Sequence, residues 1–351
     1  MADWTSSMEQ TYEYYVVDPG TWKDTKRLTT VISSSIERDS EVATLGSATI
    51  DVTETIDECY VRIYLVTIQN GVKERHALGT FIVQTPSSSF DGKVHTLTMD
   101  AYTPLIELKE SIPPIGYSRL KDENIMDAAY RITKEHVRAP VVSASCSDVL
   151  SGDFVSNTDD TWLSFTTDLI ANAKYTFELD ELGRILFSPK QDTASLQPVW
   201  TYTDDNSSIL YSDVTMNHDL YGIPNVVEVV YSDGLKSYYA KVVNDDPNSP
   251  ISTVNRGREI VYRDTSPSIG IATQRQIDEY AEQLLRELST VEYSVSYTHA
   301  YCPVRVGDCV RLHYARAGLK NIKAKVISQS IKCEPGCYVR EKAVFTTKLW
   351  R

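Results

Sequence analysis

Strand-like segments joined by tight turns fill the first hundred residues of this 351-residue chain. β-branched and aromatic residues concentrate from Tyr12 to Val17 and from Tyr60 to Ile68, as is usual in strands. Asn70-Gly71 and Asp91-Gly92 each separate two such segments, and these dipeptides are typical of two-residue hairpin turns. Because no helical segment intervenes, the pattern predicts an antiparallel sandwich or barrel.

Helical patterns begin in the middle of the chain. Asp122 is placed to cap a helix that runs to about Val137, since Pro140 prevents its continuation. A second helix is expected from about Thr158, with four apolar residues on one face: Trp162, Phe165, Leu169 and Ile170. A predicted hairpin then joins residues 174–179 to residues 184–188. These elements indicate a small α+β domain.

Strand patterns return at residues 226–231 and 237–243, on either side of an Asp233-Gly234 turn. Thr273 and Gln276 then form a capping box at the start of the clearest helix of the chain. Its apolar residues recur at helical spacing, as on a core-facing stripe: Ile277, Tyr280, Ala281, Leu284, Leu285 and Leu288. Residues 291–350 are again strand-like, with a turn at Val306-Gly307-Asp308.

Residues 80–103 and 324–347 resemble each other. Each segment is a strand, a polar turn with glycine, and a second alternating strand. The likeness extends upstream, where CYVRIY from Cys59 matches CVRLHY from Cys309 loosely. The pattern predicts an internal structural repeat, against the alternative that unrelated strands share a composition.

The balance of charge argues against a dedicated nucleic-acid binder. The formal charge is −13, whereas such proteins carry a basic surface. A conduit for DNA remains compatible, because an acidic lining repels phosphates. No apolar run is long enough to span a membrane, and the N-terminus lacks a secretory signal. The six cysteines are therefore expected in a reducing cytosol, where structural disulfides are not the default.

The sequence contains no recognisable catalytic motif. It has no G-x-G-x-x-G, P-loop, G-x-S-x-G or H-E-x-x-H pattern, and its six histidines are scattered. Acidic pairs such as Asp159-Asp160 lie in polar loops and are expected to be solvated turn residues. We therefore expect no enzyme, although residues that assemble only in three dimensions leave that class open.

Four cysteines fall close together near the C-terminus: Cys302, Cys309, Cys333 and Cys337. The last two bracket a tight turn, so two such pairs could form a four-thiolate site for zinc or an iron–sulfur cluster. The spacing matches no paired C-x2-C pattern, however. The alternatives are unliganded thiols, which are common buried residues in strands, or a disulfide.

A series of segments resembles the tail hub, or baseplate hub, proteins at the tip of long-tailed bacteriophages. The matching segments are residues 12–19, 62–65, 70–71, 78–83, 101–105, 175–187, 224–229 and 303–310. The resemblance implies two antiparallel β-barrels of the tail-tube type in one chain, the second interrupted by an insertion with a helix. It assigns residues 1–107 to the first barrel, 108–215 to a small α+β domain, 216–243 and 290–351 to the second barrel, and 244–289 to the insertion.

The same resemblance implies a function. Three chains would form a homotrimeric ring of six similar barrels that joins a sixfold tail tube to a threefold tip and gives DNA a channel without specific binding. The implied partners are a distal tail or tail-tube protein, the tape-measure protein, and tail fibre or tip proteins. The protein would be made in the host cytoplasm and located in the virion tail tip. Some similar tail-tip proteins hold a four-cysteine iron–sulfur cluster.

Two other functions stay open. One is a tail-tip cell-wall hydrolase, or an unrelated β-rich hydrolase. Many hubs carry a lysin or receptor-binding extension, but this chain ends at Arg351, directly after the last predicted strand. The other is a metal-dependent binding module built around the four cysteines.

Overall fold

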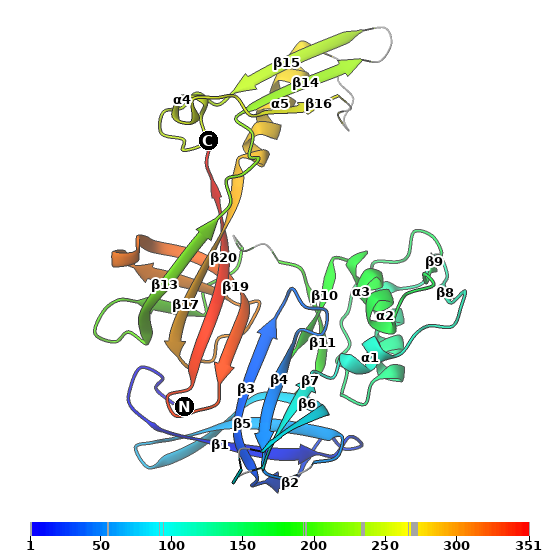
Figure 1. The fold of residues 1–351 in the computed structure, drawn as a ribbon. Helices are drawn as coiled ribbons and strands as arrows, with labels where there is room; N and C mark the ends of the chain where they lie inside the picture. The colour runs from blue at the N-terminus through cyan, green and yellow to red at the C-terminus, as the bar shows by residue number, and fades with distance from the viewer. Residues whose placement is uncertain are drawn as a thin grey trace. The chain divides into compact units, whose positions relative to one another are not determined.

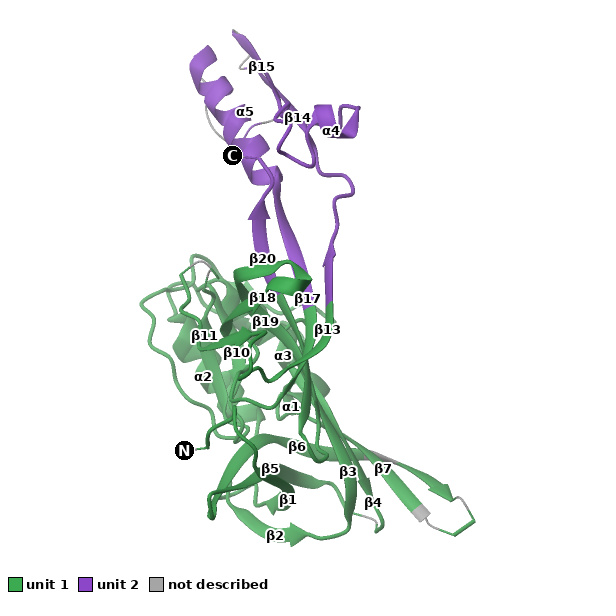
Figure 2. Ribbon diagram, turned by 90° about the vertical axis from the view of Figure 1, so that its left-hand side faces the viewer, with its two compact units in different colours: residues 1–214, 296–343 green, residues 215–295, 344–351 purple. Residues whose placement is uncertain are grey.

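The computed structural model describes residues 2–54, 56–90, 92–93, 95–191, 193, 195–232, 236–265, 267 and 273–350. The protein is mainly β, as the sequence predicts. It divides into two compact units (Figure 2): unit 1 holds residues 1–214 and 296–343, and unit 2 holds residues 215–295 and 344–351. The predicted turns at Asp91-Gly92 and Asp233-Gly234 include residues outside the described part of the chain.

The first seven strands lie together in one antiparallel part of the sheet that we call lobe 1 (Figure 1). They are β1 (Glu9–Val17), β2 (Asp24–Leu28), β3 (Val31–Asp39), β4 (Gly46–Val52), β5 (Cys59–Gln69), β6 (Val72–Phe90) and β7 (His95–Tyr102). Their order in the sheet is β3-β4-β7-β6-β5-β1-β2. Asn70 and Gly71 both have positive φ, 52° and 77°, and make the predicted tight turn between β5 and β6.

A second set of six strands, which we call lobe 2, belongs to the same thirteen-stranded sheet. It comprises β12 (Trp200–Thr203), β13 (Leu210–His218), β17 (Thr290–Ala300), β18 (Cys309–Tyr314), β19 (Leu319–Lys332) and β20 (Tyr338–Lys348), with a short 3-10 helix at Ala315–Ala317. Their order is β13-β17-β20-β19-β18-β12. The division between the two units falls within β13, β17 and β20.

The two lobes repeat one strand order. Taken in chain order, β3, β4, β5, β6 and β7 of lobe 1 occupy the places of β13, β17, β18, β19 and β20 of lobe 2. The two segments beginning at Cys59 and Cys309 are the equivalent strands β5 and β18, so the structure supports the predicted repeat at the level of strand order. The match has one exception: β1 pairs with β5 antiparallel, whereas β12 pairs with β18 parallel. Closure of either lobe into a barrel stays a prediction.

The predicted α+β domain follows lobe 1. It contains α1 (Ile106–Glu110), β8 (Ser118–Arg119), α2 (Ile125–His136), β9 (Phe154–Val155), α3 (Trp162–Ala171), β10 (Tyr175–Leu179) and β11 (Ile185–Pro189). All four predicted apolar residues of α3 are buried. Two helix starts were predicted wrongly. Asn124 rather than Asp122 caps α2, because the Asn124 side chain accepts from Asp127 N–H. The second helix, predicted from about Thr158, begins at Trp162 with Thr161 as its cap.

Besides the ends of β13, β17 and β20, unit 2 contains a three-stranded sheet covered by one helix. Its elements are β14 (Val226–Ser232), β15 (Ser237–Val243), α4 (Thr253–Arg256), β16 (Val261–Asp264) and α5 (Gln274–Leu288), in the sheet order β15-β14-β16. Thr273 caps α5 as predicted. The buried face of α5 packs on Val227, Val229 and Ala240. No helix of the described residues is long and apolar enough to cross a membrane.

The structure differs from the predicted division in two places. Residues 226–243 were assigned to the second barrel, but β14 and β15 form their own sheet with β16 and pack on α5. Residues 200–214 were assigned to the α+β domain, but β12 and β13 belong to lobe 2. Strand-like composition does not say which sheet a strand joins, since pairing partners lie far apart in sequence. The other boundaries stay predictions.

Candidate assembly surfaces

Lobe 1 and lobe 2 are joined by a backbone ladder within unit 1. The edge strand β3 pairs antiparallel with the C-terminal part of β19, from Ser328 opposite Asp39 to Lys332 opposite Ser35. Two further bonds extend the ladder: Ser40 N–H donates to the carbonyl of Ile327 at 2.9 Å, and Cys333 N–H donates to that of Ser34 at 3.0 Å. The ladder thus pairs the backbone groups at the β3 edge of lobe 1 with those of β19 in lobe 2.

A chain of side-chain hydrogen bonds crosses this ladder into lobe 2. Arg38 on β3 donates to Gln329 Oε1 at 3.1 Å, and Gln329 Nε2 donates to Glu341 Oε2 at 2.7 Å. Glu341 also accepts from the Tyr297 hydroxyl and lies 3.4 Å from His299 Nε2. Because Gln329, Glu341 and His299 are buried, these bonds are sheltered from water and specify how the strands of lobe 2 meet.

The surroundings of the buried histidine favour its charged form. Burial would lower the pKa of His299, but hydrogen bonds with Cys302 and Glu341 and the charge of Glu341 raise it to about 10. Its Nδ1 lies 2.8 Å from the carbonyl of Ala300, which suits a protonated ring that donates from both nitrogens. The cluster resembles a Cys–His–acid arrangement, and all three of its members, Cys302, His299 and Glu341, are buried.

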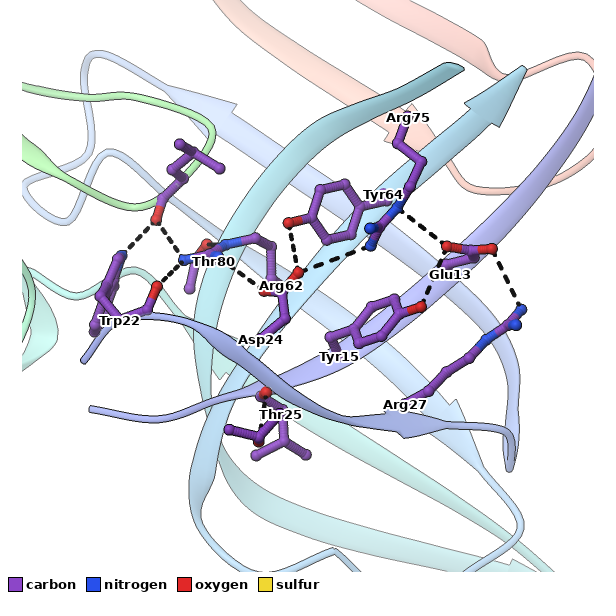
Figure 3. A network of polar contacts seen from close by, with 12 residues as sticks. Glu13, Tyr15, Trp22, Asp24, Thr25, Arg27, Arg62, Tyr64, Arg75 and Thr80 are labelled. Atoms are coloured by element: carbon purple, nitrogen blue, oxygen red, sulfur yellow. Dashed lines mark hydrogen bonds and ion pairs between the residues drawn. The ribbon is translucent and has the colours of Figure 1, made fainter. Parts of the chain in front are cut away.

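Arg62 anchors the α+β domain to lobe 1 (Figure 3). The side chain is buried, and its guanidinium donates to Thr80 Oγ1 and Asp24 Oδ1, both at 2.8 Å. It also donates to the carbonyl of Leu182 at 3.1 Å, in the turn between β10 and β11. Trp22 Nε1 donates to the same carbonyl at 2.7 Å. The turn is therefore fixed by two donors from lobe 1.

Gly183 allows this close approach. It has φ +75°, and an added Cβ would lie 2.7 Å from the Cβ of Thr80. Only glycine fits both conditions, because the left-handed region and the short contact each penalise a side chain. On the other side of the turn, Glu181 forms an ion pair with Arg305 of lobe 2. The β10–β11 turn thus contacts both lobes within unit 1.

A charged cluster covers the neighbouring face of β1, β5 and β6 (Figure 3). Glu13 lies 3.1 Å from both Lys73 Nζ and Arg75 Nε. Burial opposes its ionisation, but the hydrogen bond from Lys73 and the charges of the neighbouring cations lower the pKa of Glu13. Arg75 also stacks over the rings of Tyr15 and Tyr64, at 4.8 and 4.1 Å from their centroids. The charged groups of Glu13 and Arg75 on this face thus find their partners within lobe 1.

Several strand edges have no partner among the described residues, including the outer edges of β2, β12 and β13 and the last part of β6. β13 ends the thirteen-stranded sheet and pairs only with β17. β6 pairs with β5 only as far as Val83, opposite Cys59, and continues to Phe90 with β7 alone. Ser87, Ser88, Ser89 and Phe90 are exposed, Phe90 at 67%. Unpaired N–H and C=O groups at such edges are ready to pair with another chain.

The four predicted cysteine ligands lie in three places. Cys333 and Cys337 flank the β19–β20 turn and pack in the core of lobe 1, where burial raises their pKa to about 12 and about 11. Cys302 lies 3.3 Å from the Tyr202 hydroxyl in lobe 2. Cys309 begins β18, where its thiol donates a hydrogen bond to the carbonyl of Val310 at 3.9 Å.

This placement does not fit a four-thiolate centre. All six cysteines are free, and no three His, Cys, Asp or Glu side chains of the described residues are grouped so that they could hold a metal ion. The zinc or iron–sulfur site stays a prediction. The two cysteines of the turn act instead as apolar core residues of lobe 1, alongside Ile331 and Val339.

Unit 1 also contains a cavity of about 390 Å³ between the β10–β11 hairpin and the Arg305–Asp308 loop. Asp308 faces it with a pKa raised by burial. Its other lining residues include Glu178, Arg38 and Lys325, which carry charges of both signs. Among its lining residues, the Ser188 hydroxyl donates a hydrogen bond to the carboxylate of Glu178.

One of these contacts, that of Arg62, could have been suspected from the sequence. Arg62 interrupts the apolar run of β5, and a charged residue in a buried strand requires a partner. Its partner Leu182 lies 120 residues away, and the His299–Glu341 pair spans 42 residues, so neither partner could be identified from local pattern.

Comparisons with solved structures found the same fold in tail proteins. The tail protein from Neisseria meningitidis MC58 matches with a TM-score of 0.61 and 13% identity, over 95% of this chain and 97% of that chain. The 43 kDa tail protein of prophage MuSo2 from Shewanella oneidensis matches with 0.60 and 12%, over 95% and 98%. A chain of the PdpA–VgrG complex matches with 0.53 and 8%, over 96% and 65%.

Comparisons of the sequence with protein families and with curated proteins found no match. The resemblance to phage tail proteins is therefore confirmed in the fold and is not detectable in overall sequence similarity.

Proposed function

From a fold shared with tail proteins along 95% of the chain, we propose that this protein is a structural component of a phage tail tip. It forms a homotrimeric hub that joins a sixfold tail tube to a threefold tip and surrounds part of the DNA channel. Its partners are the distal tail or tail-tube protein, the tape-measure protein, and tail fibre or tip proteins. This role requires assembly contacts and no catalysis.

The repeated strand order is the observation that carries the proposal. Each chain contributes two lobes with one order of strands, joined by the β3–β19 ladder. Three chains therefore present six similar lobes, which can match a sixfold partner on one side while the chains keep threefold symmetry. Closed cyclic symmetry is the usual form of a homo-oligomer.

The charge of the chain is compatible with a conduit. With 48 acidic and 35 basic residues, the protein repels phosphate groups at neutral pH. DNA that passes through such a ring is not retained, because tight non-specific binding requires cations that displace its counterions.

Mass photometry of the purified chain, alone and with its tail partners, tests the proposal. We expect a species of three times the 39.5 kDa chain mass, and a ring of six similar densities in electron micrographs. A chain that stays monomeric under all these conditions would contradict the hub. Peptidoglycan turnover by the same preparation would favour the cell-wall hydrolase instead.

A further inference from the structure

Two consecutive prolines give one loop of the α+β domain a fixed shape. The loop joins α1 to β8 and contains Ile112-Pro113-Pro114-Ile115, which we call the proline loop. Each proline fixes its own φ and restricts the residue before it to extended backbone, so residues 112 and 113 are extended as in a polyproline helix. Tyr117 N–H then donates to the carbonyl of Pro114 at 2.9 Å and closes a turn with Ile115 at its tip.

The proline loop projects apolar side chains into solvent from a firm base. Ile112 is 71% exposed and Ile115 is 97% exposed, whereas Pro113 is buried. At the start of the loop, Trp162 N–H donates to the carbonyl of Ser111 at 3.0 Å. A rigid segment loses little conformational entropy when it binds, and its exposed isoleucines favour burial. The loop is therefore ordered for docking before it meets a partner.

Unit 1 also has a groove of about 580 Å³, which we call the aromatic groove. It is formed by the N-terminal segment, the start of β13, the end of β17 and the β19–β20 turn. Glu9 is the only charged residue among its described lining residues, and residues 111–118 of the loop carry no charge at all. Most of the lining is aromatic or apolar, and includes Trp4, Met8, Tyr211, Tyr301 and Pro335.

The aromatic groove is likewise preformed. Gly336 N–H donates to Gln10 Oε1 at 3.2 Å, which ties the β19–β20 turn to β1. The ring of Trp4 packs edge-to-face on that of Tyr301, with centroids 5.1 Å apart. No hydrogen bond of the described residues uses the indole N–H of Trp4, so this group is free to donate to a peptide carbonyl.

We propose that the proline loop of one chain docks in the aromatic groove of the next copy of this chain. Extended segments with proline bind aromatic-lined grooves, because their backbone is already ordered and leaves its carbonyls open to donors. Trp4 and Tyr211 offer rings to Ile112 and Pro114, and the Trp4 N–H offers a donor. This inference rests on the proposed trimeric hub and adds to it a contact that involves no pairing of strands.

The occupant is a second copy because the loop lies far from the groove of its own chain. Figure 1 shows β8, which follows the loop, and β13, which contributes Tyr211, on opposite sides of unit 1. A contact between two different surfaces generates a closed ring or an open filament. One loop covers less than the roughly 800 Å² per partner that a stable pair needs, whereas a closed trimer makes three such contacts at once.

Binding of the loop as a peptide tests the groove without requiring a trimer. The receptor is the full chain with Ile112→Ser and Ile115→Ser, whose own loop leaves the groove empty. We expect it to bind a fluorescent peptide ESIPPIGY, residues 110–117, and Trp4→Ala in the receptor to weaken binding by about tenfold. The peptide ESSPPSGY should not bind. Equal binding of the two peptides, or no binding of ESIPPIGY, would overturn the proposal.

Cross-linking tests the contact between chains. A tagged chain carries Ile115→Cys and an untagged chain carries Ser6→Cys in the groove, both in a Cys59→Ser, Cys146→Ser background. Co-expression and oxidation should give a covalent pair of one tagged and one untagged chain. The matched control replaces Ile115→Cys by Val254→Cys, because Val254 is also exposed, at 61%, and lies outside the loop. Equal cross-linking of the control, or none in assembled trimers of the first pair, would overturn the contact.

The outcomes separate the two proposals. Ile112→Ser with Ile115→Ser should shift mass photometry from trimers toward single chains, and Val254→Ser should not. Trimers as abundant as those of the wild type would overturn this contact and leave the hub intact. A wild-type chain that never forms trimers, even with its tail partners, would remove the hub and this contact together.

Discussion

The imidazole of His299 lies 3.4 Å from the carboxylate of Glu341, and neither side chain is exposed. The two residues come from β17 and β20, so the pair holds together strands that are neighbours in the sheet and 42 residues apart in sequence. A buried ion pair tolerates the loss of one partner poorly, because the remaining charge has no water to solvate it.

Replacing this acid should destabilise unit 1 strongly. Glu341→Gln leaves the imidazolium without its counter-ion and weakens the bond to Tyr297, at a cost of about 3 kcal/mol of unfolding free energy. Urea denaturation measures the change. The matched control is Glu334→Gln, because Glu334 is exposed in the turn between β19 and β20. This change should shift the urea midpoint of unfolding little. Equal shifts for the two variants would contradict a buried pair.

The same pair predicts a dependence of stability on pH. The pKa of His299 is about 10 in the folded protein and near 6.5 in the unfolded chain. The folded state therefore binds this proton more tightly, and its contribution is complete below pH 6.5 and is lost as the pH rises to about 10. We expect the wild type to lose stability between pH 7 and 10 more steeply than Glu341→Gln. If the unfolding free energies of the two proteins fell in parallel over this pH range, the prediction would be wrong.

Local signals in the sequence account for much of the fold. The Asn70-Gly71 turn and the Thr273 cap were predicted because a few neighbouring residues determine each of them. The repeat was predicted from residues 80–103 and 324–347 and from the upstream segments at Cys59 and Cys309, and the structure places these upstream segments in the equivalent strands β5 and β18.

What the sequence did not reveal depends on residues far apart in the chain. The buried Glu341 looks like any alternating acid in a strand until β20 is placed beside β17. Likewise, β14 and β15 look like barrel strands, and only their packing on α5 identifies a separate sheet. The start of α2 was misplaced because Asp122 and Asn124 are both good caps two residues apart.

Arg62 should be sensitive to any shortening. Arg62→Ala removes the donor to Asp24 Oδ1 and Thr80 Oγ1 and leaves the carbonyl of Leu182 with the Trp22 donor, so we expect a loss of about 3 kcal/mol. Hydrogen exchange should increase in the β10–β11 turn. Arg27→Ala provides the control, because its ion pair with Glu13 is 3.7 Å long and its side chain is 53% exposed. Unchanged exchange in the turn would show that Trp22 alone holds it.

Gly183 and Gly222 form a matched pair for separating backbone strain from steric contact. Both have positive φ, 75° and 72°, but an added Cβ meets Thr80 at the first and nothing within 4 Å at the second. Gly222→Ala should cost about 1 kcal/mol, as expected for the left-handed region alone. Gly183→Ala should cost at least about 2 kcal/mol more and increase hydrogen exchange in its turn. If the two substitutions cost the same unfolding free energy, the β10–β11 turn must shift away from Thr80 without penalty.

Thiol labelling tests where the cysteines lie. Cys59 and Cys146 are partly exposed, while the other four are buried. The thiolate is the reactive form, and burial together with Asp57 and Glu58 raises the pKa of Cys59, so Cys146 should react first with a maleimide.

Four thiols should react only in denaturant, and Cys146→Ser should remove the fast phase. Burial and metal ligation both protect cysteines, so labelling alone does not separate them, and metal analysis of the same sample must accompany it. Because the structure distributes Cys302, Cys309 and the Cys333–Cys337 turn over three places, we expect no stoichiometric zinc or iron. One equivalent of zinc or one cluster per chain, lost on Cys333→Ala, would require these strands to rearrange.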